Sequence, residues 1–413
     1  MPCGRAVDLH QETNVTDLPK IILKPRKALP FHSRHPWVFA GTIDKIEGRP
    51  ADGAEVQLLA DNGKFLARGL YNSQSKIAVR LYSWDADRPL DDVFWADKIE
   101  RALVLRRDLL KLNGGPDSAF RAVNSEADGL SGLTVDKFAD FAVMQLTALG
   151  LGVRRAALGK LVQERLGVRG VFLRTEKSIG KLEGLDLSDG PLCGEVPPAE
   201  VVIGENGLQF AVNLSEGQKT GWYLDQRDNR IAAAAYCAGK RVLDAFCYSG
   251  GFGLQAKYAG ASEVECVDAS ATALALVERN AALNGLDGIV RTKADAFDHL
   301  EKLVAAKRVF DVVILDPPKF ARNRSAVPGA MQGYRKLHQL ALKLLPAGGI
   351  LVSCCCTGLI TQEMLEDVLA LTAAEGKRDV QILERRGPAA DHPTSVSCRE
   401  SSYLKSIISR VAD

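Results

Sequence analysis

Residues 310–320 read FDVVILDPPKF, and residues 348–358 read GGILVSCCCTG. Short aliphatic runs bounded by Gly and Pro are typical of strands that are buried on both faces of a parallel sheet. Because ligands bind beyond the carboxyl ends of such strands, we expect Asp316 and a thiol of the second stretch to share one crevice. A carboxylate beside a thiol favours nucleophilic chemistry on a bound substrate over simple binding.

The size and composition of the chain indicate a globular protein with several domains. A length of 413 residues suggests two or three domains. The chain is 46% hydrophobic and 25% charged, which argues against disorder and against a fibrous class. No segment approaches the roughly 20 apolar residues of a membrane span, and no signal pattern opens the chain, so we expect a cytoplasmic protein without a membrane partner. A net charge of +2 leaves a nucleic-acid partner open.

The cysteines do not form a recognisable metal or disulfide pattern. The chain has nine, and their spacing matches neither a disulfide framework nor a zinc site. Cys354, Cys355 and Cys356 could not all turn toward one metal within a strand, because alternate side chains face opposite ways. We therefore predict no metal.

Apolar periodicity divides the chain into four parts. We expect a loose tail at residues 1–18, a small β-rich domain at 19–86, a central α/β domain at 87–200, and a larger α/β domain at 201–413. The last part alternates strand and helix signals, which is the pattern of a doubly wound sheet.

Cations and aromatic residues alternate near the start of the β-rich part, and Arg34 and Trp37 are among them. Such a mixture suits a surface that stacks and neutralises nucleic acid. A solvated rim around aromatic core residues explains the same pattern equally well.

A cofactor site is predicted at the start of the larger domain. Residues 242–253 read VLDAFCYSGGFG, a strand that runs into a glycine-rich turn and then a helix at 254–259. The glycines are too close together for a dinucleotide G-x-G-x-x-G, which argues against a nicotinamide enzyme. Two further strands end near Asp268 and Asp295. Each acid alone could be a cap or turn residue, but acids at successive strand ends beside a glycine turn favour a ligand with ribose hydroxyls.

These motifs together with DPPKF at 316–320 resemble class I S-adenosylmethionine-dependent methyltransferases. More narrowly, the chain is similar to the bacterial family that methylates carbon-5 of a cytosine in large-subunit ribosomal RNA. RHPWVF at 34–39 and LARG at 66–69 resemble that family's PUA domain, and NSEADGL at 124–130 its central domain. TGWYLDQR at 220–227 resembles the segment that leads into its catalytic fold.

The resemblance implies a three-layer, Rossmann-like methyltransferase domain preceded by a small β-rich PUA-like domain and a central α/β domain. It also implies S-adenosylmethionine as cofactor and large-subunit ribosomal RNA, 23S in bacteria, as partner, with a homodimer as one option for the assembly. Tyr223, Asp225 and Gln226 could instead cap the first helix of the domain. The implied cofactor contacts are Asp244, Phe246, Ser249, Gly250, Asp268, Asp295, Tyr223, Asp225 and Gln226.

The family chemistry requires a thiolate that adds to carbon-6 of the cytosine, so that carbon-5 can accept a methyl group. Aligning Thr357-Gly358 with the family pattern makes Cys356 the nucleophile, and Asp316 would hydrogen-bond the base. Cys354 and Cys355 are then extra, and Cys355 should face away from the site. The implied RNA contacts are Pro317, Pro318, Lys319, Phe320, Arg322, Arg34 and Trp37.

Several points stay open at this stage. Lys319 stands where other RNA cytosine methyltransferases carry a second cysteine, so Asp316, Lys319 and a water remain candidates for the base that removes the carbon-5 proton. His392 follows the family pattern in the loop before the last strand, where it could line the pocket or be structural. Arg322, Arg324, Arg335 and Lys336 could hold phosphates or be merely solvated.

Three other functions fit parts of the pattern. A purine methyltransferase would use Asp-Pro-Pro without a thiol. A non-catalytic RNA-binding assembly factor would keep the fold only for its shape. A nicotinamide oxidoreductase rests on fold analogy alone.

Overall fold

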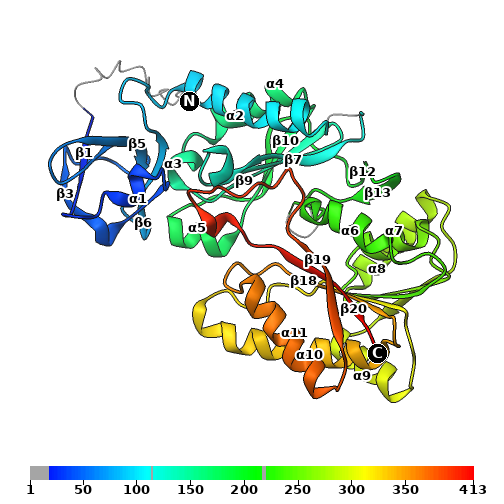
Figure 1. The fold of residues 1–413 in the computed structure, drawn as a ribbon. Helices are drawn as coiled ribbons and strands as arrows, with labels where there is room; N and C mark the ends of the chain where they lie inside the picture. The colour runs from blue at the N-terminus through cyan, green and yellow to red at the C-terminus, as the bar shows by residue number, and fades with distance from the viewer. Residues whose placement is uncertain (1–17, 113–114, 216–219) are drawn as a thin grey trace.

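The computed structural model describes residues 18–112, 115–215 and 220–413, and the tail predicted at 1–18 lies outside this part except for Leu18. The sheets follow one another along the chain from the blue N-terminal part to the red C-terminal part (Figure 1). This arrangement confirms the predicted fold class. None of the helices within the described ranges combines the length and apolar character that a bilayer span requires.

The N-terminal domain is a six-stranded sheet in the order β2-β6-β5-β4-β1-β3. Its pairs are antiparallel except for β1 with β4, which are parallel. Alternation along β4 buries Val56 and Leu58 and leaves their neighbours partly exposed, as expected for a strand with one core face. Its elements are β1 (Lys20–Leu23), α1 (Leu29–His32), β2 (Trp37–Phe39), η1 (Ala40–Thr42), β3 (Ile43–Glu47), β4 (Glu55–Leu59), β5 (Phe65–Tyr71) and β6 (Ile77–Ser83).

The central domain is a five-stranded sheet in the order β11-β10-β9-β8-β7, and α2 and α4 pack beside each other against it. Its first helix is α2, which Asp91 caps by accepting from the Phe94 amide at 2.8 Å. Its elements are α2 (Asp92–Val104), the π-helical η2 (Leu105–Leu109), β7 (Ala119–Asn124), η3 (Ser125–Asp128), β8 (Leu133–Phe138), β9 (Phe141–Leu146), α3 (Leu149–Gly152), α4 (Arg155–Leu166), β10 (Gly170–Arg174), α5 (Lys177–Glu183) and β11 (Gly190–Gly194).

The part after residue 200 begins differently from the expected strand and helix alternation. Its first elements are an antiparallel hairpin, β12 (Val201–Glu205) and β13 (Leu208–Val212). The hairpin shares one apolar cluster with Phe138 of the central sheet and Ala281 of the next domain. The two short strands have no helix between them and pack against both α/β domains. The hairpin therefore joins these two domains.

The C-terminal domain contains a seven-stranded sheet in the order β16-β15-β14-β17-β18-β20-β19, in which β20 runs opposite to the other six strands. Its elements are η4 (Leu224–Gln226), α6 (Arg227–Ala234), β14 (Arg241–Ala245), α7 (Gly251–Tyr258), β15 (Glu263–Asp268), α8 (Ala271–Leu283), β16 (Ile289–Lys293), α9 (Ala296–Ala305), β17 (Val312–Leu315), η5 (Arg324–Ala326), α10 (Val327–Leu344), β18 (Ile350–Cys355), α11 (Gln362–Glu375), β19 (Val380–Arg386), η6 (Arg399–Ser401) and β20 (Lys405–Val411).

Helices cover both faces of this sheet, which makes three layers (Figure 1). One apolar cluster joins the sheet to α9, α10 and α11, and a second joins it to α6, α7 and α8. Cys355 belongs to the first cluster and Cys354 to the second. Strand β18 therefore turns these two thiols to opposite faces of the sheet, as predicted, and both are fully buried.

Candidate active site

Asp316 and Cys356 follow two neighbouring parallel strands. Strand β17 ends at Leu315, whose register partner on β18 is Ser353. Asp316 comes immediately after β17, and Cys356 comes immediately after the last residue of β18. Both side chains are partly exposed and both line the same cavity. The crevice predicted from the two strand ends is therefore present.

The cavity has a volume of about 630 Å³, which lies within the range of small-molecule and cofactor sites. It extends from the ends of β14 and β15 to the ends of β17 and β18. Its walls are Glu176, Trp222, Tyr223, Asp225, Gln226, Arg230, Phe246, Cys247, Tyr248, Ser249, Gly251, Phe252, Asp268, Ala269, Asp295, Ala296, Asp316, Pro317, Pro318, Lys319, Cys356, Tyr403 and Leu404.

Two predicted cofactor contacts do not line this cavity. Asp244 is 1% exposed and its Oδ2 accepts from the Gly253 amide at 2.8 Å. Burial raises the pKa of Asp244 to about 7. Gly250 is buried with φ +86°, a left-handed conformation that suits glycine. Asp244 and Gly250 therefore shape the turn without lining the cavity, and their contact with the cofactor stays a prediction.

Gly253 explains why the turn is rich in glycine. A Cβ atom at this position would lie 2.5 Å from the Cys266 Sγ and 3.1 Å from the Asp244 Oδ2. Helix α7 can therefore pack closely on β14 and β15 only with hydrogen at this position. Phe246 and Ser249, on the same turn, do line the cavity.

Asp268 and Asp295 both line the cavity and both bind local backbone. Asp268 accepts from the Tyr248 amide at 3.0 Å and from the Ser270 amide at 2.8 Å. Asp295 caps α9 by accepting from the amides of Phe297 and Asp298. Each of these two aspartates is thus both a cap or turn residue and part of the cavity wall. The hydrogen bonds from backbone amides fix the orientation of each carboxylate.

Tyr223, Asp225 and Gln226 line the cavity from the segment before α6. Asp225 Oδ2 accepts from the Tyr403 hydroxyl at 2.6 Å, which ties this segment to the start of β20. Burial and the nearby charge of Asp316 raise the pKa of the Tyr223 hydroxyl well above its usual value. Tyr223 is thus a neutral hydrogen-bonding group on the wall of the cavity.

The predicted RNA contacts after β17 are divided. Pro317, Pro318 and Lys319 line the cavity. Phe320 does not line the cavity, and the centroid of its ring lies 5.2 Å from the centroid of the Tyr334 ring. Arg322 is exposed just beyond it.

The cations proposed for phosphates differ in their surroundings. Arg324 is exposed, like Arg322. Arg335 forms an ion pair with Glu375, and Lys336 forms one with Glu301 at 2.6 Å. Both pairs are well exposed, so solvent screens them.

Arg34 and Trp37 lie in the N-terminal domain and do not line the cavity. The Trp37 indole N–H donates to Glu126 at 3.1 Å and to Ser131 at 3.2 Å, and both acceptors belong to the central domain. Arg34 has φ +61° and lies beside a smaller hollow between the same domains. The indole N–H thus forms a contact between domains, and stacking of the ring on RNA stays a prediction.

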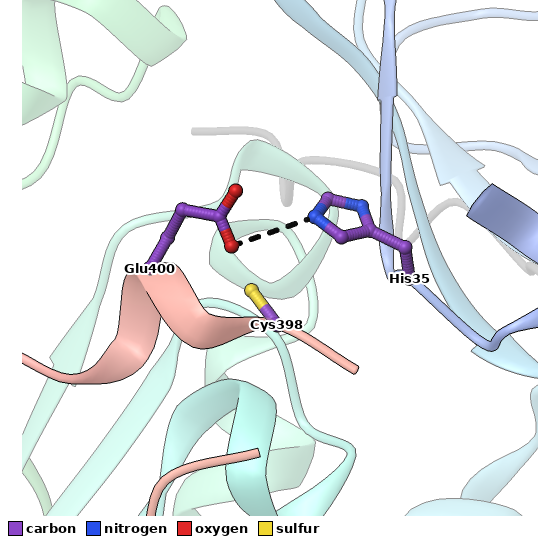
Figure 2. A group of neighbouring side chains, drawn as sticks. All are labelled: His35, Cys398 and Glu400. Atoms are coloured by element: carbon purple, nitrogen blue, oxygen red, sulfur yellow. Dashed lines mark ion pairs between the residues drawn. The ribbon is translucent and has the colours of Figure 1, made fainter. Parts of the chain in front are cut away.

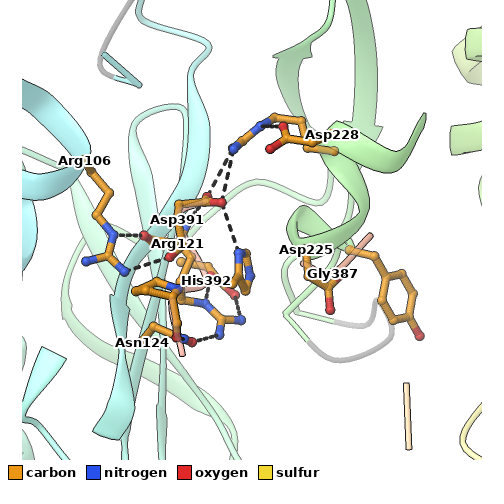
Figure 3. Close-up of polar contacts among 12 residues, drawn as sticks. Arg106, Arg121, Asn124, Asp225, Asp228, Gly387, Asp391 and His392 are labelled. Atoms are coloured by element: carbon orange, nitrogen blue, oxygen red, sulfur yellow. Dashed lines mark hydrogen bonds and ion pairs between the residues drawn. The ribbon is translucent and has the colours of Figure 1, made fainter. Parts of the chain in front are cut away.

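The loop between β19 and β20 reaches the central domain, where Asp391 is fully buried (Figure 3). Its carboxylate accepts from the Arg121 amide at 2.8 Å and from both terminal nitrogens of Arg227 at 3.1 Å. Burial opposes ionisation, but the hydrogen bond from His392 and the charge of Arg227 hold the pKa of Asp391 far below its usual range. His392 is buried against Asp391 and does not line the cavity.

The same loop also meets the N-terminal domain, where His35, Cys398 and Glu400 place donor atoms within 4.8 Å of one another (Figure 2). The Trp37 amide donates to His35 Nδ1 at 3.3 Å, so the neutral ring carries its proton on Nε2, which faces Glu400 at 3.7 Å. A metal on Nε2 would need that proton on Nδ1 instead. Burial and nearby glutamates raise the pKa of the Cys398 thiol to about 12. The cluster is therefore a polar contact between domains.

Several cavity residues were missed from the sequence. Tyr403 and Leu404 come from the segment just before the antiparallel strand β20, and Glu176 comes from the central domain. The sequence gives little indication that these residues line the cavity, because folding brings them to it from remote segments. An aromatic residue just before the last strand is the one signal that could have pointed to Tyr403.

The strand order, the glycine turn and the acids at successive strand ends define a class I methyltransferase fold. A PUA-like family model matches residues 21–84, and a model of S-adenosylmethionine-dependent methyltransferases matches residues 188–399, more than half of the 413 residues. The chain belongs to this family of S-adenosylmethionine-dependent methyltransferases, and its cofactor is S-adenosylmethionine.

Its relatives match over almost the whole chain. Ribosomal RNA large subunit methyltransferase I from Shewanella amazonensis is 39% identical over 394 residues, which cover 95% of this chain and 99% of the relative. The protein of the same name from Shewanella denitrificans is 40% identical over 395 residues, with the same coverage. That from Klebsiella pneumoniae is 37% identical and covers 95% of this chain and 98% of its own.

A solved structure described as a methyltransferase complexed with SAH has the same fold. Its TM-score is 0.82 at 22% identity, with 95% of this chain and 100% of that chain covered. The whole order of domains is therefore shared, although at this identity the likeness concerns the fold alone.

The residues at the ends of β14 and β15 fit S-adenosylmethionine. Asp268 offers a carboxylate for ribose hydroxyls at the cavity wall. Ser249 Oγ is buried on the same wall and has no hydrogen-bond partner among the described residues. A buried hydroxyl without a partner costs free energy that a bound polar ligand can recover. Phe246 supplies an apolar surface beside them.

Proposed function

We propose that this protein methylates carbon-5 of a cytosine in large-subunit ribosomal RNA, 23S in bacteria, through a temporary bond between Cys356 and the base. The observation that carries the proposal is the position of Cys356 and Asp316 at neighbouring strand ends in the cavity that also holds the cofactor residues. The names of the relatives support the RNA substrate. The PUA-like match agrees with binding of RNA.

In this mechanism the Cys356 thiolate adds to carbon-6, and the electron pair of the carbon-5 to carbon-6 bond moves toward carbon-5. Asp316 hydrogen-bonds the ring or its amino group and holds the base in register. When bound, S-adenosylmethionine supplies the methyl group from its sulfonium to carbon-5. A base then takes the carbon-5 proton, the carbon-6 to sulfur bond breaks, and the thiolate is restored. Asp316, Lys319 and a water are the candidates for that base.

The cytosine must leave its stack to enter the cavity, so a loop or junction in the RNA is the favoured target. Pro317 and Pro318 give the wall next to Asp316 a rigid backbone, because each proline fixes its own φ. Lys319 on the same wall can neutralise a phosphate. Arg322 and Arg324 extend this basic edge into solvent.

Substitution of Cys356 by Ala tests the proposal directly. We expect C356A to lose methyl transfer to ribosomal RNA while its affinity for S-adenosylmethionine, measured by calorimetry, stays within about twofold. The matched control is C193A, which removes a partly exposed thiol outside the cavity and should keep both properties. Wild-type protein incubated with 5-fluorocytosine RNA should carry a covalent adduct that peptide mapping locates on Cys356.

Each competing function predicts a different result. If C356A still transfers methyl groups at the normal rate, a purine methyltransferase without covalent catalysis replaces the proposal. If the wild-type protein binds RNA but neither binds the cofactor nor modifies the RNA, the role of an assembly factor replaces it.

A further inference from the structure

A buried lysine lies behind the turn that carries Cys356. Lys405 is the first residue of β20, and its register partner on β18 is Cys355. The residue is only 8% exposed, and unlike the preceding Leu404 it does not line the cavity. A lysine is rarely buried so deeply without partners, because its ammonium group loses hydration.

The partners of this ammonium are two backbone carbonyl oxygens. Lys405 Nζ donates to the Thr357 oxygen at 2.9 Å and to the Tyr403 oxygen at 3.1 Å. Thr357 directly follows Cys356, and Tyr403 lines the cavity. One side chain therefore fastens the turn after β18 to the segment before β20, and this side chain does not line the cavity.

The charge of this ammonium is coupled to the thiols beside it. Burial lowers the pKa of Lys405, whereas negative charge on Cys355 and Cys356 acts in the opposite direction. Such coupling is reciprocal, because a cation that is favoured by a thiolate favours that thiolate equally.

The other titratable groups around Cys356 do not replace this cation. Asp316 follows β17, Tyr223 precedes η4, and Tyr334 lies on α10; the last two phenols respond to charge on both Asp316 and Cys356. These groups are acidic, as are the neighbouring thiols on β18 itself. Arg230, on the cavity wall, is already bound to Glu205 at 2.5 Å.

We infer that Lys405 is a positioning residue for the proposed nucleophile, which holds the Cys356 turn in place and stabilises the thiolate from behind. This inference rests on the proposed function, in which that thiolate adds to the base. Lys319 lines the cavity and Lys405 does not, so the two lysines have separate tasks.

The test compares K405Q with K405R in the full-length protein. Gln keeps N–H donors for the carbonyl oxygens but removes the charge, whereas Arg keeps the charge. The readout is the rate at which iodoacetamide alkylates Cys356 between pH 6 and 10, followed by peptide mass spectrometry. This readout requires neither RNA nor methyl transfer.

We expect the midpoint of Cys356 alkylation to rise by about one pH unit or more in K405Q and to stay closer to wild type in K405R. Methyl transfer by K405Q at pH 7 should fall roughly tenfold and recover partly as the pH rises. Affinity for S-adenosylmethionine should stay unchanged. The control is K343M, which alters an exposed lysine on α10 and should shift neither profile.

Unchanged alkylation and activity profiles in K405Q would overturn the inference. If K405Q fails to fold by circular dichroism, K405M supplies the uncharged variant: a raised alkylation midpoint in K405M but not in K405R supports a charge effect, and equal midpoints in K405M and wild type contradict it. Failure of the proposed function looks different, since C356A would then retain methyl transfer whatever the lysine variants do.

Discussion

The cofactor half of the cavity, at the ends of β14, β15 and β16, differs from the chemical half, at the ends of β17 and β18, in what holds its side chains. Asp295 and one oxygen of Asp268 are fixed by amides two or three residues away, and the other oxygen of Asp268 accepts from the Tyr248 amide of the adjacent glycine turn. Cys356 instead sits on a turn that remote Lys405 fastens. Local sequence therefore specifies the first half, whereas the second half depends on packing between distant segments.

The difference between the two halves predicts that the largest effect on activity comes from substitution of Asp316. We expect D316N to lower the rate of methyl transfer at saturating substrates by roughly 100-fold or more, because the amide cannot act as an ionised acceptor or base toward the cytosine. Calorimetric affinity for S-adenosylmethionine should stay within about twofold of wild type. The two measurements together separate chemistry from cofactor binding.

Asp311 gives the matched control for this substitution. It precedes the other end of β17 and binds the Arg241 amide at 2.9 Å. D311N should reduce stability slightly and leave the rate at saturation near wild type. A weakened cofactor affinity in D316N with an unchanged rate would place Asp316 in the cofactor half and break the comparison.

A smaller and opposite effect is expected at Asp268. D268N should weaken S-adenosylmethionine binding by roughly 10-fold to 100-fold, because a hydrogen bond to a charged group contributes about 1.5–3 kcal/mol. The transfer rate at saturating cofactor should change by less than about threefold. Titration calorimetry gives the affinity and single-turnover kinetics give the rate.

The exposed Asp287, in the loop after α8, provides the control. D287N should change neither quantity. Loss of rate without loss of affinity in D268N would show that the acids of the cofactor half also take part in the chemistry.

The same division explains how much could be predicted from the sequence. Buried strands between Gly and Pro, and the acids after them, revealed the doubly wound sheet and the neighbouring positions of Asp316 and Cys356. The Ser270 cap of α8 was also predictable, because its partner is the Ala273 amide three residues away.

What could not be predicted depends on contacts across long sequence separations. Tyr403 binds Asp225, and Asn124 binds the Pro393 carbonyl oxygen in the loop before β20. Trp37 resembles a stacking ring in sequence, yet its indole N–H bonds to the central domain. Aromatic and charged residues show the same sequence pattern whether they bind RNA or contact another domain. Only the folded structure distinguishes the two cases.

The smallest effect concerns acid stability of the chemical half. His338 on α10 is buried, and its Nε2 lies 2.8 Å from the Ser353 hydroxyl on β18, the strand that leads to Cys356. Burial lowers the pKa of His338 to about 4 from the ordinary 6.5. Between these values the unfolded chain binds a proton that the folded chain does not, so the free energy of unfolding falls as the pH drops from 6.5 toward 4.

This coupling should remove about 3 kcal/mol of stability by pH 4 and nothing at pH 8. H338Q keeps an N–H for Ser353 but cannot titrate, so its unfolding free energy, measured with urea, should depend less steeply on pH by up to one proton. H32Q, which changes an exposed histidine of the N-terminal domain, should retain the wild-type slope. Equal slopes in H338Q and wild type would mean that His338 takes up its proton while folded. The protein would then tolerate a charged His338 beside β18. The chemical half of the cavity would in that case not depend on keeping His338 neutral.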